Sequence, residues 1–227
     1  MQIPQHIVLF PDGNRRWAKQ KGLSSLDGHK QGYNNLLDFL KWCKDRKINT
    51  LTAFGFSTEN WNRSPEEVSY LMKLLETCLT ENLDKYNEHN VKVRVIGQRD
   101  RLPESLKSAI QITEETTKNN SGAFLNLAIS YGGRWDILNA VKKIIEEKIP
   151  AEKIDENLFE SYLSTAGLPT PDLVIRAGGE KRMSNFLLWQ AAYSELYFSP
   201  KLWPEFSEQD LDQALEEYDR RTRRFGK

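Results

Sequence analysis

Two spacings of apolar residues alternate along the chain. Short runs rich in β-branched, leucine and aromatic residues predict strands, and they cover His6–Phe10, Thr50–Phe56, Val91–Gly97, Phe124–Ser130, Asp172–Arg176 and Glu195–Phe198. Most segments between them place apolar residues three and four positions apart, which is typical of helices with one buried face. One such stripe is Val68, Leu71, Met72, Leu75, Leu79 and Leu83. This alternation predicts an α/β fold: one domain, residues 1–227, with a central, mostly parallel six-stranded sheet flanked by helices.

Composition limits what the chain can bind. Its 227 residues with 39% hydrophobic content suffice for the core of one such domain. Basic and acidic side chains balance at 32 each, so no general field attracts nucleic acid. The basic run Arg220–Phe225 is more simply a solvated helix end or a dimer contact. No apolar stretch approaches the about 20 residues of a membrane-spanning helix, and the N-terminus lacks signal-peptide features. We therefore expect a cytoplasmic protein that binds no nucleic acid and contacts membranes only peripherally.

Candidate chemistry follows the first strand. In parallel sheets, ligands bind at the loops that leave the carboxyl ends of the strands. Here the chain continues with Asp12, Gly13, Asn14, Arg15, Arg16 and Trp17. The glycine permits close backbone approach to a ligand, and guanidinium groups bind anions. Asp12–Asn14 alone is more simply a turn with an N-cap, and the neighbouring arginines are what favour an anion site.

A second polar segment follows the second strand. Its members are Ser57, Thr58, Glu59, Asn60, Trp61 and Arg63. Ser64 and Glu67 form a plausible capping box with Pro65 at the first helical position, so that part is structural. The preceding residues exceed what a cap needs, and they could bind a phosphate while the Trp61 indole lines an apolar path. Taken alone, the segment fits an ordinary loop equally well.

The fifth strand delivers Arg176, two glycines, Arg182 and Ser184 to one place, where we expect a helix to begin near Ser184. A helix start supplies free amides and partial positive charge, and guanidinium forks match phosphate oxygens, so this segment suits a diphosphate. The fourth strand ends in another glycine-rich turn, in which Arg134 could help to hold the anion or could be an ordinary surface residue.

The absence of some motifs narrows the ligand. Neither a P-loop nor a Gly-x-Gly-x-x-Gly pattern occurs after the first strand, which argues against ATP or NAD. No cysteine–histidine cluster has zinc spacing, whereas Asp12 and Glu195 are hard oxygen donors at two strand ends, suited to Mg²⁺ shared with phosphate oxygens. His29 opens the first long helix and could either hydrogen-bond a phosphate or satisfy local structure.

Together, four segments resemble the cis-prenyltransferase family: His6–Trp17, Phe56–Arg63, Tyr131–Asp136 and Asp172–Trp203. The block Ile175–Glu180, followed by Arg182, Ser184–Gln190 and Glu195–Phe198, is highly specific to that family. The resemblance implies a homodimer that uses Mg²⁺ to condense isopentenyl diphosphate with an allylic prenyl diphosphate, releasing pyrophosphate. The lipid product would then provide the peripheral membrane contact.

The resemblance also implies roles for individual residues. Asp12, Asn60 and His29 are the expected catalytic residues, with Asp12 and Glu195 as the Mg²⁺ ligands. Gly13, Asn14, Arg16 and His29 are expected beside the allylic diphosphate, and Arg15 and Trp17 are further expected substrate-binding residues. Arg176, Arg182 and Ser184 are expected to hold isopentenyl diphosphate. Ser57, Thr58, Glu59, Trp61 and Arg63 belong to a segment similar to the family's flexible, substrate-positioning loop.

One departure from the family pattern affects the substrate. Four residues before His29 the family usually carries a diphosphate-binding arginine, and this chain has Ser25. Arg15 could partly compensate, and Gly55 leaves room for longer products. Two alternatives remain open: an enzyme that makes a short or irregular terpene diphosphate or uses another acceptor, and a non-catalytic partner subunit. The retained motif residues argue against the second alternative.

Overall fold

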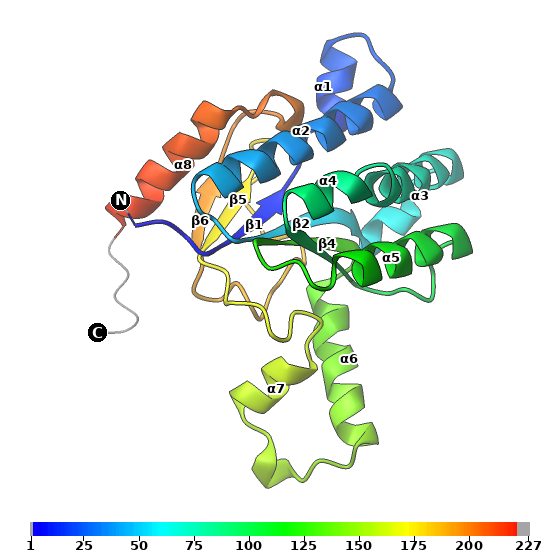
Figure 1. The fold of residues 1–227 in the computed structure, drawn as a ribbon, viewed down its shortest axis with the longest axis vertical. Helices are drawn as coiled ribbons and strands as arrows, with labels where there is room; N and C mark the ends of the chain where they lie inside the picture. Colours follow the sequence, from blue (N-terminus) through cyan, green and yellow to red (C-terminus); the bar gives the residue numbers. More distant parts are fainter. Residues whose placement is uncertain (1, 222–227) are drawn as a thin grey trace.

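Six parallel strands form the centre of the molecule (Figure 1). The structure is a computed structural model that describes residues 2–221. The strands are β1 His6–Phe10, β2 Thr50–Ser57, β3 Val91–Ile96, β4 Ala123–Tyr131, β5 Leu173–Arg176 and β6 Glu195–Phe198. They lie in the order β3-β4-β2-β1-β5-β6, and each neighbouring pair is parallel. The predicted strands match these bounds to within one residue, and the predicted fold class is confirmed.

Helices cover one face of this sheet. The α-helices are α1 Asn14–Gln20, α2 Ser25–Asp45, α3 Pro65–Thr80, α4 Leu83–Glu88, α5 Glu104–Thr117, α6 Gly133–Glu146, α7 Glu156–Tyr162 and α8 Glu208–Arg220; short 3₁₀ helices are η1 Thr58–Asn62, η2 Ala151–Lys153 and η3 Trp203–Glu205. Alternate strand residues such as Ile7 and Leu9 pack in a large core with Phe39 of α2, Leu79 of α3 and Leu211 of α8. β1 is buried along its whole length, and successive side chains point to opposite faces of the sheet, so Ile7 and Leu9 join this core whereas Val8 and Phe10 do not.

The opposite face is covered largely by irregular chain. Val8 and Phe10 of β1 pack with Phe186 and Leu187 in a second, smaller core. The helix predicted to begin near Ser184 is absent, because Ser184 (φ 42°), Asn185 (φ 63°) and Leu187 (φ 44°) adopt left-handed backbone conformations. A right-handed helix cannot accommodate such residues, so the segment turns repeatedly and lays its apolar side chains on the sheet.

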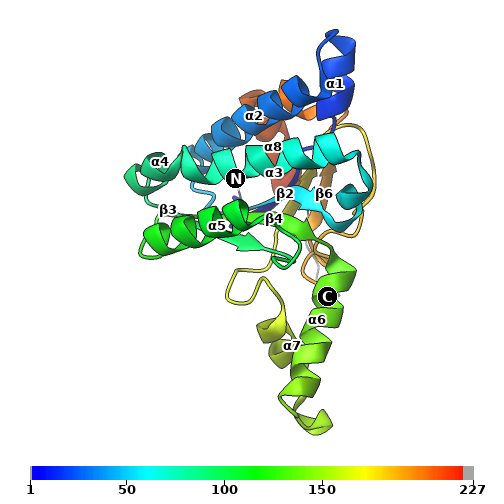
Figure 2. The same ribbon diagram turned by 90° about the vertical axis from the view of Figure 1, so that its right-hand side faces the viewer.

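Helices α6 and α7 extend away from the sheet, as Figures 1 and 2 show. The outer side of α6 carries Leu138, Val141 and Ile145, which are 60%, 38% and 68% exposed. Their spacing places them on one stripe of the helix. We call α6 with this stripe the arm. Within residues 2–221, no helix has the length and apolar character that crossing a bilayer requires.

Candidate active site

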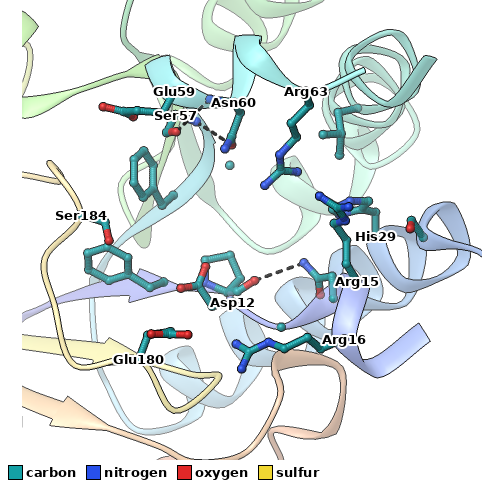
Figure 3. Close-up of a pocket in the computed structure, with 18 of the residues that line it drawn as sticks. Asp12, Arg15, Arg16, His29, Ser57, Glu59, Asn60, Arg63, Glu180 and Ser184 are labelled. Atoms are coloured by element: carbon teal, nitrogen blue, oxygen red, sulfur yellow. Dashed lines mark hydrogen bonds between the residues drawn. The ribbon is translucent and has the colours of Figure 1, made fainter. Parts of the chain in front are cut away.

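A cleft of about 1490 Å³ opens at the carboxyl ends of the strands (Figure 3). The loops after β1, β2, β4 and β5 contribute to its wall, together with the turn between α1 and α2. The predicted site residues that line it are Asp12, Gly13, Asn14, Arg15, Arg16, His29, Ser57, Glu59, Asn60, Arg63, Arg176, Arg182 and Ser184. Arg15, Arg16 and Arg63 surround the space beside Asp12 in Figure 3. Segments far apart in sequence therefore meet in one cationic cleft.

Arg176 is the central charged group of the cleft. Its side chain is only 4% exposed, and its Nε and Nη2 donate to Oδ2 of Asp12 over 2.9 and 2.6 Å. Nη1 donates to Oγ of Ser184 over 2.9 Å and to the carbonyl of Arg182. The guanidinium also lies 4.7 Å from the centre of the Phe10 ring. These contacts offset the cost of burying the charge and fix the orientation of the fork.

Asp12 keeps one carboxylate oxygen for another ligand. Both Arg176 contacts fall on Oδ2, and Oδ1 has no hydrogen-bond partner among residues 2–221. A carboxylate oxygen on the wall of a cationic cleft suits a divalent cation shared with a phosphate. The described residues contain no preformed cluster of three or more His, Cys, Asp or Glu side chains for a metal. Asp12 therefore fits an ion whose other ligands come from substrate and water.

The turn after β1 is fixed by close packing against α2. Gly13 has φ 106° and precedes α1, and Arg16 Nη2 donates to the carbonyl of Gly178 over 2.7 Å. The Asn14 amide donates to the carbonyl of Pro11 over 3.1 Å, while its buried Oδ1 has no partner in the described chain. A Cβ at Gly32 would lie 2.1 Å from that Oδ1, so α2 can approach Asn14 only because a glycine is present.

Glu67 gathers three cleft residues around one carboxylate. His29 Nε2 and Arg63 Nη1 each lie 3.1 Å from its Oε1, and Arg15 Nη1 lies 3.6 Å from its Oε2. Burial raises the pKa of Glu67, but hydrogen bonding from His29 and the nearby arginines leave it below its usual value. Burial lowers the pKa of His29, an effect that the bond to Glu67 only partly offsets. Near neutral pH, His29 is therefore a neutral ring beside an ionised carboxylate.

The predicted capping box at α3 is only half present. The backbone N–H of Glu67 donates to Oγ of Ser64, and Pro65 occupies the first helical position as expected. The Glu67 side chain turns toward His29 instead of returning to the Ser64 backbone. The predicted structural role of Glu67 is therefore incomplete, and its place beside His29 could not be predicted, because a glutamate at this helical position has the same local sequence signature in both roles.

Segment η1 presents some of its predicted residues to the cleft and turns others inward. Ser57 and Asn60 exchange hydrogen bonds, which closes the turn. Trp61 points away: its indole donates to Ser130 over 2.9 Å and lies 4.6 Å from the Arg101 guanidinium. Thr58 likewise lies outside the cleft wall. The expectation that Trp61 lines the ligand path is therefore not met, because its ring packs behind the loop.

Trp17 and Glu195 also lie outside the cleft. The Trp17 indole donates to Glu205 over 3.2 Å. Glu195 pairs in register with Leu173 at the amino end of β6, so it lies at the sheet edge opposite Asp12, and it forms a 2.6 Å ion pair with Arg221. Within one chain, the predicted pairing of Asp12 and Glu195 around a single ion is wrong. Glu195 is the first residue of β6, as predicted, but the start of one parallel strand lies at the sheet edge opposite the end of another, where Asp12 lies.

The cleft joins its polar groups to an apolar floor. Phe54, Gly55, Leu71 and Leu188 line it beside the arginines, and the Phe54 ring stacks on Phe186 with centroids 4.0 Å apart. Gly55 is the extra residue of a β-bulge, because Phe54 pairs with Ala128 and Phe56 with the next residue, Ile129. Guanidinium groups above such a floor suit a ligand with an anionic head and an apolar chain. Fold and cleft together define an α/β enzyme that acts on an amphipathic phosphate.

Comparison with known proteins identifies the family. The sequence model of a family described as "Putative undecaprenyl diphosphate synthase" matches residues 10–226. The tritrans,polycis-undecaprenyl-diphosphate synthase (geranylgeranyl-diphosphate specific) of Thermoplasma volcanium is 47% identical over 99% of this chain and 89% of its own length. The isoprenyl transferase of Aquifex aeolicus is 46% identical over 100% and 97% of the two chains. The chain therefore belongs to the cis-prenyltransferase family and is a prenyl transferase.

A solved structure supports the same placement. Lavandulyl diphosphate synthase from Lavandula x intermedia, solved in complex with dimethylallyl diphosphate, superimposes with a TM-score of 0.95 at 40% identity. The match covers 99% of this chain and 98% of that chain. At this identity and coverage, the two chains share their fold over almost their whole lengths.

Proposed function

We propose that the chain condenses isopentenyl diphosphate with an allylic prenyl diphosphate, releases pyrophosphate and forms a cis double bond. The supporting observation is the Asp12–Arg176–Ser184 cluster, which stands among further arginines above an apolar floor. The wall provides anion-binding groups on both sides of Asp12, as two diphosphates would require. The floor of Phe54, Gly55 and Leu71 provides for the prenyl chains.

Each cleft residue has a role in this reaction. Arg176, Arg182 and Ser184 would bind the isopentenyl diphosphate, and Asn14, Arg15, Arg16 and His29 would bind the allylic diphosphate. As the allylic C–O bond breaks, negative charge accumulates on the departing diphosphate, where fixed guanidinium donors stabilise it most. Mg²⁺, held at Asp12 with substrate oxygens, would supply further charge to that group. Burial keeps the pKa of His29 low in the unliganded cleft, so the ring adds no repulsion among the arginines before the diphosphate binds.

The direct test uses purified protein, radiolabelled isopentenyl diphosphate and a series of allylic primers from dimethylallyl to geranylgeranyl diphosphate. We expect Mg²⁺-dependent release of pyrophosphate and a prenyl diphosphate whose length is read by mass spectrometry. EDTA should abolish turnover, and excess Mg²⁺ should restore it. If no primer supports turnover in Mg²⁺, the proposal fails, and the non-catalytic partner subunit becomes the better account.

A short or irregular terpene product is the second candidate. It is favoured by Ser25, which lines the cleft where the family usually carries an arginine, and by the similarity to lavandulyl diphosphate synthase. A hydroxyl replaces a fork donor at the allylic diphosphate, so the primer is bound through fewer charged contacts.

Ser25→Arg tests this candidate. The new guanidinium would reach into the cleft from the first turn of α2, and we expect the KM for the allylic primer to fall by about tenfold, the effect of one charged hydrogen bond. Ser25→Gln is the control, because it adds length without charge. Unchanged allylic KM and product length in Ser25→Arg would contradict a relocated phosphate contact.

We also propose that the protein is a cytoplasmic homodimer joined through the arm. An exposed apolar stripe on a helix that extends from the body is typical of a protein–protein interface. The same stripe on a second copy of the chain could pack against it in a symmetric dimer. Membrane contact would then be peripheral and would accompany the lipid product. Of the basic run Arg220–Phe225, residues 222–225 lie outside the described part of the chain.

A further inference from the structure

Asn185 stands where three loops of the cleft meet. Its side-chain Nδ2 donates to Oε1 of Glu59 in η1 over 2.9 Å, and its Oδ1 accepts from the backbone N–H of Arg134 over 2.9 Å. Its own carbonyl accepts from the N–H of Gly133 over 2.6 Å. One residue of the β5–β6 loop is thus bonded to the segment after β2 and to the turn after β4.

The chemistry of the partners permits only one orientation of this amide. A backbone N–H can only donate, and an ionised carboxylate can only accept, so the oxygen must face Arg134 and the nitrogen must face Glu59. Burial raises the pKa of Glu59, but the bond from Asn185 and neighbouring donors leave it below its usual value, so the acceptor is ionised. The backbone conformation, φ 63°, is one that asparagine tolerates better than most residues.

The three loops are packed without spare room. A Cβ added at Gly132 would lie 2.6 Å from Oγ1 of Thr58 and 2.7 Å from Nδ2 of Asn185. The segment η1 and the β4–α6 turn are therefore in close contact, with the Asn185 amide between them. We call this contact the joint. Asn185 and Glu59 each stand next in sequence to a cleft residue. Ser184, before Asn185, is hydrogen-bonded to Arg176, and Asn60, after Glu59, lines the opposite wall of the cleft.

We propose that Asn185 is a positioning residue for prenyl transfer. Its amide bonds the loop that carries Ser184 to η1, and this bond fixes the position of Asn60 and Arg63. This inference rests on the proposed function for its kinetic readout. Asn185 joins the two halves of the cleft, so the isopentenyl-binding side and the loop beside the allylic side are held in one relative arrangement. Glu59, predicted above as a substrate-binding residue, becomes the anchor of η1.

Asn185→Gly isolates the side chain, because glycine adopts the same left-handed backbone without strain. We expect kcat to fall by about tenfold, the effect of losing one hydrogen bond to a charged group. The KM for isopentenyl diphosphate should change less than about twofold, since Arg176 and Ser184 keep their own bonds. A merely structural role would displace Ser184 and raise that KM instead.

A swap of donor and acceptor tests the joint itself. Asn185→Asp keeps the acceptor for Arg134 but sets a carboxylate against Glu59, and we expect a larger loss of kcat than in Asn185→Gly. Glu59→Gln alone keeps an oxygen that accepts from Asn185, so it should lose less kcat than Asn185→Asp does. The double variant N185D/E59Q restores a donor–acceptor pair and should recover most of kcat. Failure of Glu59→Gln to rescue Asn185→Asp would overturn the proposal.

A readout independent of turnover separates this inference from the proposed function. Hydrogen exchange of the peptide that contains η1 should rise in Asn185→Gly and Asn185→Asp and return to the wild-type rate in N185D/E59Q. Asn119→Asp is the same chemical change at an exposed residue near the amino end of β4, and it should alter neither the hydrogen-exchange rate of η1 nor turnover. Unchanged η1 exchange in both single variants refutes the joint. A wild-type protein without turnover refutes the proposed function and leaves the exchange test decisive.

Discussion

The buried guanidinium of Arg176 is already oriented for binding an anion in this cleft. Its fork is held by Asp12, Ser184 and a backbone carbonyl before any substrate arrives, so little reorganisation is needed on binding. Such an arrangement depends on planar geometry as well as on charge. Lysine would keep the charge but could not donate to Oδ2 of Asp12 from two nitrogens held in one plane.

Arg176→Lys should therefore lower kcat/KM for isopentenyl diphosphate by about 100-fold, as expected when a preorganised donor pair is lost. The measurement is steady-state kinetics with circular dichroism to verify folding. Arg99→Lys is the matched control, because Arg99 is exposed and pairs with Glu114 away from the cleft, and it should behave as wild type. Comparable kinetics in the two variants would contradict the role of the fork.

His6 gives the protein a pH-dependent stability. Its Nδ1 bonds the carbonyl of Pro169 and its Nε2 the hydroxyl of Thr52, each over 2.7 Å, and burial lowers its pKa despite those bonds and nearby Asp172. The folded pKa thus lies below the unfolded value, so the unfolded chain takes up the proton first. Stability is lost as pH falls from about 6.5 toward the folded pKa.

His6→Gln should reduce the difference in melting temperature between about pH 7.5 and about pH 5.5, although part of the slope remains because the pKa of His29 is shifted in the same direction. Thermal unfolding at both pH values checks this. His89→Gln, at an exposed ring, should leave the difference unchanged. An unaltered pH slope in His6→Gln would show that the His6 pKa is not the cause.

At the scale of elements, the seating of α2 against the turn after β1 depends on two glycines. A Cβ at Gly28 would lie 2.2 Å from the carbonyl oxygen of Asn14, which is backbone and cannot rotate away. In an exposed helix interior, alanine is favoured over glycine by about 1 kcal/mol. Here the collision should reverse that preference and push α1 away from the cleft.

Gly28→Ala should thus lower the free energy of unfolding by about 1–3 kcal/mol, the usual cost of overpacking, and should raise the allylic KM because Asn14 and Arg16 move with α1. Urea unfolding and kinetics provide the two measurements. Gly22→Ala is the comparison: it meets no atom within 4 Å, so it reports only the cost of its left-handed backbone. A more stable Gly28→Ala variant would refute the packing argument.

The elements were predictable from the sequence because strand burial and helical spacing are local patterns, and His6–Phe10 and Glu195–Phe198 match to the residue. Other features depended on distant contacts. Ser184 was expected to begin a helix, yet the chain there must turn back to bury Phe186 against Phe10. Trp61 and Thr58 have polar neighbours in sequence but face inward, and the roles of Glu67 and Asn185 exist only through partners from other loops.

At the scale of the whole molecule, the arm is the feature that calls for a partner. Leu138 and Ile145 are more than half exposed on a helix that leaves the body, and the structure covers them with no other described segment. Two arms packed together would remove both stripes from water, and apolar burial of this kind drives most stable homodimers.

Ile145→Glu should convert the protein from a dimer to the 26.4 kDa monomer, because two carboxylates would face each other across a symmetric interface. Sedimentation velocity at micromolar concentration measures this. Ile112→Glu, on α5 at 55% exposure, makes the same change away from the arm and should remain dimeric. A wild-type monomer, or an Ile145→Glu dimer, would contradict assembly through the arm.

The parallel sheet has two rims with different roles: the carboxyl ends of the strands and their amino ends. One rim holds the arginines and the apolar floor, whereas the other holds His6 with Thr52 and the Glu195–Arg221 tether. Protein engineers can exploit this division. Thermostability could be raised by redesigning the second rim without retuning specificity, and primer choice could be altered at the first while the scaffold keeps its melting point.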